Sequence, residues 1–239
     1  MWPSSKRPRE PIRRSMGRAG PRRSRRFARW AWSLRRDVLL SAIAELHRLS
    51  TSFILGYHGC DAKVAKRLID GEPFRTSEND YDWLGPGIYF WEANPQRALS
   101  FAQEVRKREP NKIRSPTVVG AVVELGLCLD LASEAGIKQA GAAYRALAKL
   151  YKAANKPLPK NHGGPDDLLR KLDCAVISQL HAIRHEEGQS ALDTVRGIFI
   201  EGDEIYPAAG FRAKTHCQVC VCNPSQIKGV FRVSASEFA

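Results

Sequence analysis

The order in which strand-like and helix-like segments follow one another constrains the fold of this chain more than any other feature of its sequence. Short β-branched segments alternate with short amphipathic helices in the first half, two longer helical patterns follow, and strands return at the end. A regular doubly wound sheet would continue the alternation to the end of the chain. The order therefore predicts an α+β domain, a split α/β arrangement with a helical insertion. The strand-like segments are 51–59, 84–90, 117–131, 194–202 and 215–233, and the helix-like segments are 61–71, 94–109, 133–154 and 165–187.

Capping residues mark the ends of the two short helices. Asp61 is expected to cap the first of them, and Gly71 to end it. Asn94 followed by Pro95 marks the start of the second, because proline fits the first position of a helix. The β-branched segment 117–131 is long enough for a central strand and its return.

The positive charge of the chain is concentrated near its N-terminus. The net charge is +13, and residues 1–36 contribute most of it, with Lys6 and twelve arginines against one acid, Glu10. The segment is nearly free of aliphatic side chains, so we expect a disordered tail. A prediction of nucleic-acid binding from the positive charge therefore rests on this tail alone. A transit peptide, an export signal around Ser24–Phe27 and an anionic membrane surface are alternatives, as is a start at Met16.

The remaining residues, 37–239, are expected to form a single domain, with the helical insertion at about 133–193 and an amphipathic helix at 37–49. No stretch approaches the roughly 18 apolar residues of a membrane span. The six cysteines are scattered apart from a cluster near the C-terminus, where Cys217-x-x-Cys220 forms half of a zinc pattern without a second pair. We therefore expect no metal, reduced thiols and a cytoplasmic location.

A glycine-rich turn, Gly85-Pro86-Gly87, opens like a dinucleotide-binding loop but does not continue as one. Phe90 stands where the third glycine belongs, and the turn enters a strand instead of a helix. A Rossmann fold is therefore excluded, and no Walker phosphate loop is present either.

Three motifs agree in their order and spacing. The first strand ends with His58-Gly59, the turn Gly85–Phe90 follows some thirty residues later, and a strand near the C-terminus carries Gln218 eight residues before a Gln-Ile pair. Together they resemble the ADP-ribosyltransferases of the His-Tyr-Glu branch, which contains the poly-ADP-ribose polymerases and the diphtheria-like toxins. The resemblance covers about residues 50–110 and 195–233 and leaves the helical stretch at 133–193 without a counterpart.

The resemblance implies a fold of two packed, mainly antiparallel sheets and NAD as the substrate. It implies that His58 hydrogen-bonds a ribose hydroxyl and that the backbone of Gly59 clamps the nicotinamide amide, where a side chain would block the ring. Tyr89 would stack on the nicotinamide, and Arg75 would lie near the adenosine half. Cleavage of the nicotinamide–ribose bond passes through an oxocarbenium-like transition state, which these groups suit.

The sequence departs from the family pattern at two positions. A second stacking tyrosine would fall near Ser100, where Phe101 is the nearest aromatic replacement. Gln218 stands in the position of the glutamate, and an amide accepts a hydrogen bond but carries no charge and cannot act as a general base. The resemblance therefore implies transfer of a single ADP-ribose unit without polymer extension.

Several nearby polar residues are candidates for accessory roles. His216 shares a strand face with Gln218, because residues two apart point to the same side. Asp82 precedes the tyrosine strand, and Glu201 precedes the last loop before Gln218. In that loop and just after it, Phe211, Arg212 and Lys214 are expected to contact the acceptor.

These observations predict an NAD-dependent mono-ADP-ribosyltransferase whose acceptor, protein or nucleic acid, the sequence does not identify. A toxin or defence role follows by analogy alone. Three alternatives remain open: an NAD glycohydrolase, a non-catalytic module that binds NAD or ADP-ribose, and a nucleic-acid-binding protein that acts through its tail.

Overall fold

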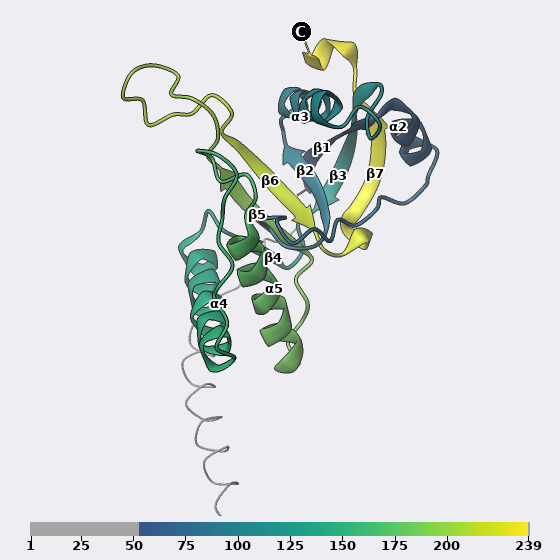
Figure 1. Cartoon of the computed structure of the whole chain (residues 1–239). Helices are drawn as coiled ribbons and strands as arrows, with labels where there is room; N and C mark the ends of the chain where they lie inside the picture. Colours follow the sequence, from purple (N-terminus) through teal and green to yellow (C-terminus); the bar gives the residue numbers. More distant parts are fainter. Residues whose placement is uncertain (1–52, 239) are drawn as a thin grey trace, which may run out of the picture. The chain divides into compact units, whose positions relative to one another are not determined.

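A computed structural model describes residues 53–238 of the chain, which contain seven strands and four α-helices (Figure 1). The tail at 1–36 and the helix expected at 37–49 lie outside the described residues. The strands are β1 (Phe53–Asp61), β2 (Ile88–Glu92), β3 (Pro116–Glu124), β4 (Cys128–Asp130), β5 (Thr194–Phe199), β6 (His216–Val221) and β7 (Ile227–Arg232). The helices are α2 (Ala62–Ile69), α3 (Pro95–Arg108), α4 (Glu134–Ala153) and α5 (Lys171–Glu186), with 3-10 turns at Pro224–Gln226 and Ala235–Phe238.

The strands form one mixed sheet in the order β4-β5-β6-β2-β1-β3-β7, in which every pair is antiparallel except β4 with β5. The α+β class is confirmed. The arrangement differs from two separate packed sheets, because a short ladder between β1 and β2 joins the two halves. That ladder holds only two residue pairs, whereas β1 pairs with β3 over nine.

The two short helices begin where their capping residues predict. Asp61 accepts a hydrogen bond from the backbone N–H of Lys63 at 2.9 Å, and Asn94 caps α3 with Pro95 at its first position. α2 and α3 cover opposite faces of β1 and β3 (Figure 1). The neighbouring residues Val118 and Val119 point to opposite sides of β3, the first packing with α3 and the second with α2.

The sequence suggested that the segment after β3 returns beside β3, and the structure differs. β4 instead lies at the far edge of the sheet and pairs with β5 in parallel, with Cys128 opposite Thr194. A parallel pair needs a long crossover connection, which the helices α4 and α5 supply. The helical insertion therefore connects two neighbouring strands.

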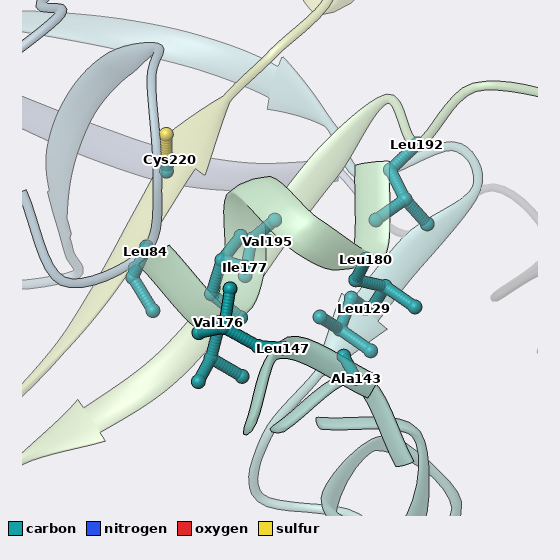
Figure 2. Packing of buried hydrophobic residues seen from close by; sticks show 10 residues of the cluster. All are labelled: Leu84, Leu129, Ala143, Leu147, Val176, Ile177, Leu180, Leu192, Val195 and Cys220. Carbon is teal, nitrogen blue, oxygen red and sulfur yellow. The ribbon is translucent and has the colours of Figure 1, made fainter. Parts of the chain in front are cut away.

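The largest cluster of buried apolar residues lies between these helices and the sheet (Figure 2). Leu147 of α4 and Leu180 of α5 meet Val195 of β5 and Cys220 of β6 there. Leu84, from the loop before β2, joins the same cluster, so this core also fixes the loop that leads to Tyr89. No helix among the described residues is long and apolar enough to cross a membrane.

Candidate functional site

The candidate site lies where β1 and β2 stop pairing. Tyr57 is paired with Trp91, but the following residues of β1 pair only with β3. In an antiparallel strand alternate residues turn their backbone groups to the same neighbour. Part of the backbone from His58 to Asp61 is therefore directed to a side on which β2 no longer pairs.

The ring of His58 spans this gap. Its Nδ1 atom lies 2.9 Å from the backbone carbonyl oxygen of Tyr89, and its ring contacts Phe74 and Phe90 edge-on or tilted at 5.5 and 5.9 Å between centroids. Burial lowers the pKa of His58, and the hydrogen bond to Tyr89 opposes this shift. The ring is therefore neutral near pH 7, with its proton on Nδ1, because a carbonyl oxygen only accepts.

Gly59 is the point of closest approach between β1 and α3. A Cβ atom at this position would collide with the backbone oxygen of Ala98 and lie 3.3 Å from the Cβ of Ala102. Both neighbours belong to α3. The absence of a side chain at Gly59 is thus required by packing, a reason separate from ligand approach.

Tyr89 fixes the loop that precedes it. Its hydroxyl accepts a hydrogen bond from the backbone N–H of Leu84 at 3.0 Å and donates one to the carbonyl of Gly85 at 2.8 Å. Burial raises the pKa of Tyr89 far above its usual range, so the hydroxyl stays protonated. What Tyr89 can offer a ligand is its half-buried ring.

Gln218 is held by an indole. Trp83 Nε1 donates a hydrogen bond to Gln218 Oε1 at 2.6 Å, and the Trp83 ring packs edge-on against Phe199. A Cβ at Gly197 would meet the Trp83 ring at 2.7 Å, so a glycine on β5 makes room for the indole. Sequence reasoning missed Trp83, because 135 residues separate it from its partner.

Register places three candidate side chains and Trp91 on one face of the sheet. Trp91 is the cross-strand partner of Gln218. Tyr89 lies two residues from Trp91 on β2, and His216 lies two residues from Gln218 on β6. His58 contacts Phe90, which points to the opposite face of β2. Among the described residues, His58 is thus joined to the other side chains through the backbone of Tyr89.

His216 is buried beside this group. Its Nδ1 atom lies 2.6 Å from the carbonyl oxygen of Lys214, and its ring stacks on Phe199 with centroids 5.5 Å apart. Burial lowers the pKa of His216, and the Lys214 carbonyl opposes that shift. The ring is accordingly neutral near pH 7.

Glu201 forms a buried ion pair. Its carboxylate accepts hydrogen bonds from Arg97 of α3 at 3.0 and 3.2 Å, and both side chains are nearly buried. Lys214 pairs with Glu104 of the same helix at 3.0 Å. These pairs tie both ends of the loop between β5 and β6 to α3, and the loop itself extends beyond the strands (Figure 1).

The remaining candidates divide into one that lies near the group and two that do not. Phe101 of α3 packs against Trp91 at 4.8 Å between centroids, so it lies beside the cross-strand partner of Gln218. Asp82 accepts hydrogen bonds from Asn79 and closes the turn before β2. Arg75 lies exposed in the loop after α2, and no described contact brings it to the other residues.

The half zinc pattern does not assemble. Residues three apart on a strand point to opposite faces, and accordingly Cys217 donates to Glu92 whereas Cys220 faces the carbonyl of Pro86. Burial raises the pKa of Cys217 to about 12. Within residues 53–238 no three His, Cys, Asp or Glu side chains lie close enough to hold a metal ion.

Two surface cavities are lined by other residues than His58, Tyr89, His216 and Gln218. One, of about 870 Å³, is lined by both acids and bases from the loop after β5 and from the segment before α5, among them Asp166, Arg170, Glu204 and Arg212. The other, of about 490 Å³, is lined by Asn79, Asp80, Lys171 and Cys174, among others. Asp80 forms an ion pair with Lys171 at 2.7 Å in its wall.

Comparisons with known proteins supply a relative but no activity. No family model matches the chain, and no solved structure gives a significant match. A stretch of 36 residues is 44% identical to an uncharacterized protein of Methanocaldococcus jannaschii, covering 15% of this chain and 17% of that protein. The match thus spans a small part of either chain.

Proposed function

We propose that this chain is an NAD-dependent ADP-ribosyltransferase that moves a single ADP-ribose unit to a macromolecular acceptor and releases nicotinamide. One observation carries the proposal. The His-Gly pair at the end of β1 lies beside Tyr89 of β2 at the point where the two strands stop pairing, and Gln218 lies one strand further on the face of Tyr89. Three motifs widely separated in sequence thus meet within one region.

The chemistry of the group suits the reaction. Cleavage of the nicotinamide–ribose bond builds positive charge on the ribose, and neutral nicotinamide leaves. The Tyr89 ring offers a flat surface whose stacking contributes about 0.5–1.5 kcal/mol beyond area burial. The unpaired edge of β1 at Gly59 offers backbone groups for the amide of the nicotinamide ring.

Gln218 sets a limit on the reaction. Its amide oxygen already accepts the Trp83 indole N–H, and its amide N–H₂ group can only donate. Such a residue can position a ribose hydroxyl but cannot remove its proton. We infer transfer of one unit, with no extension. The engaged amide also favours a second candidate, a module that binds NAD without cleaving it.

The loop between β5 and β6 is our candidate for contact with the acceptor. Phe211 is exposed in this loop, and Arg212 pairs with Glu204 at 3.4 Å across the loop. Lys214, at its end, contacts Glu104 of α3. The acceptor is a protein or a nucleic acid, the basic tail favours the second, and a toxin or defence role in the cytoplasm remains a proposal by analogy.

The test is release of nicotinamide from NAD by the full chain, measured by chromatography. We expect release by the wild type and a fall of about 10²-fold or more in Tyr89→Ala and His58→Ala. Tyr144→Ala, at an exposed position of α4, is the matched control and should leave the rate unchanged. NAD binding in a calorimeter without release would favour the binding module, and neither binding nor release would overturn both proposals.

A further inference from the structure

Two buried nitrogen atoms beside Gln218 have no hydrogen-bond partner among the described residues. They are Nε1 of Trp91 and Nε2 of His216, in side chains of residues that are 4% and 6% exposed. The two rings lie 6.2 Å apart between centroids. Leaving a buried polar group unpaired costs about 1–3 kcal/mol, so two such atoms on neighbouring rings point to a ligand that pairs with both.

The two atoms have opposite hydrogen-bonding roles. An indole N–H only donates. Nδ1 of His216 faces two acceptors, the Lys214 carbonyl at 2.6 Å and a Glu201 carboxylate oxygen at 4.0 Å, so it carries the proton of the neutral ring. Nε2 then carries a lone pair and can only accept a hydrogen bond.

The charged groups around His216 leave the ring neutral. Burial lowers its pKa, the Lys214 carbonyl raises it, and Arg97 of α3 lowers it. Glu201 and Glu104 act against Arg97 but are already paired with cations. The side chain of Lys214 points to these same carboxylates. Near pH 7 the two rings therefore present one donor, Trp91 Nε1, and one acceptor, His216 Nε2.

One donor beside one acceptor is the complement of a hydroxyl group. A carboxylate would face the lone pair of Nε2, and an ammonium or guanidinium group would face the indole N–H, so each leaves one atom unpaired. Phe101 lies against Trp91 and Phe199 against His216, which encloses the site in aromatic rings.

We propose that Trp91 Nε1 and His216 Nε2 bind the hydroxyl group that attacks the ribose, so that the acceptor is an O–H compound, water or an alcohol. This inference rests on the proposed NAD chemistry. The nicotinamide–ribose C–N bond breaks and its electron pair leaves with nicotinamide. The hydroxyl oxygen forms the new C–O bond to the ribose, and its proton passes to His216 Nε2. His216 thus takes the role that Gln218 cannot.

The acceptor class is tested with the full chain, NAD and one added nucleophile at a time: methanol, agmatine or acetate. We expect ADP-ribose from water and O-methyl ADP-ribose from methanol, and their ratio separates the two hydroxyl sources. A main product linked to agmatine nitrogen or to acetate would overturn the proposal.

Two variants test the atoms themselves. His216→Gln removes the base, so we expect nicotinamide release to fall about 10²-fold and to lose its decline at acid pH. Trp91→Phe keeps the ring but removes the donor, and should raise the KM for methanol more than it lowers kcat. His185→Gln, on the exposed end of α5, is the control. Wild-type rates and pH profiles in both variants would overturn the site while leaving the proposed function intact.

Nuclear magnetic resonance tests hydroxyl binding without turnover. With ¹⁵N-labelled full chain, we expect His216 to report a proton on Nδ1 and a lone pair on Nε2, and the Trp91 indole N–H to show a contact with bound water. A wild type inert towards NAD would refute the proposed function and, with it, the catalytic step. A missing water contact or a proton on Nε2 would refute the binding site as well.

Discussion

His58 Nδ1 lies 2.9 Å from the carbonyl oxygen of Tyr89, across the point where β1 and β2 cease to pair. A hydrogen bond from a side chain thus links the two strands beyond their last backbone pair. The link holds only while Nδ1 carries its proton, and the neutral ring satisfies this condition. The opening between the strands is therefore spanned by a group that titrates.

The first prediction concerns stability against pH. Burial lowers the pKa of both His58 and His216 below 6.5. Between the lowered pKa and 6.5 the unfolded chain binds protons that the native rings do not, so the free energy of unfolding falls as pH falls. We expect urea unfolding to show lower stability at about pH 5.5 than at about pH 7.5. His58→Asn, which keeps a donor for Tyr89, should reduce this dependence, whereas an unchanged slope would contradict the assignment.

The second prediction concerns Gly59. In Gly59→Ala the new methyl group would collide with the backbone of Ala98, so α3 must move away from β1. We expect a loss of about 1–3 kcal/mol in the free energy of unfolding, typical of overpacking. Gly210→Ala, where a Cβ meets no atom within 4 Å, is the control. Equal urea midpoints for the two variants would show that the contact yields without cost.

The third prediction concerns Gln218. Gln218→Glu places a carboxylate where the Trp83 indole already donates a hydrogen bond, so the new charge has a partner. A carboxylate beside the developing positive charge should raise nicotinamide release at least about tenfold. Gln103→Glu, on the exposed side of α3, adds the same charge elsewhere and should not change the rate. A folded Gln218→Glu protein with an unchanged rate would count against the placement of NAD beside this residue.

The fourth prediction concerns the ion pair at the base of the β5–β6 loop. The side chains of Arg97 and Glu201 are 10% and 7% exposed, so Glu201→Ala leaves a buried charge without its main partner. We expect a loss of about 3–5 kcal/mol and faster proteolysis within residues 202–213. In Glu72→Ala, which breaks an ion pair whose carboxylate is 54% exposed, the loss should stay below about 1 kcal/mol. Similar losses in both variants would mean that the loop is held by other contacts.

Local signals in the sequence were sufficient to predict where a helix begins when its capping residue is close in sequence. Asp61 and Asn94 start their helices because each side chain bonds to a backbone N–H two or three residues ahead. The second long helix begins at Lys171, not at 165 as the periodicity suggested. Its first turn is capped from a distance, by Asn161 Oδ1 bonding to the backbone N–H of Leu172 at 2.9 Å.

Long-range pairing explains what sequence reasoning missed. The parallel partner of β4 lies beyond two helices, and nothing in a segment of three residues specifies it. The motif residues His58, Tyr89 and Gln218 could be chosen because their order and spacing resemble a family pattern. The roles of Trp83 and Trp91 could not, because they depend on which residues the fold brings next to Gln218.

The two-pair ladder between β1 and β2 also bears on how the chain folds during synthesis. β2 emerges from the ribosome soon after β1, yet its main partner, β6, follows only roughly 120 residues later. At about 5–20 residues per second the far edge of β2 waits several seconds or more without a neighbour. An open strand edge invites wrong partners. In the nascent chain, β2 is therefore exposed to misassembly in the interval before β6 arrives.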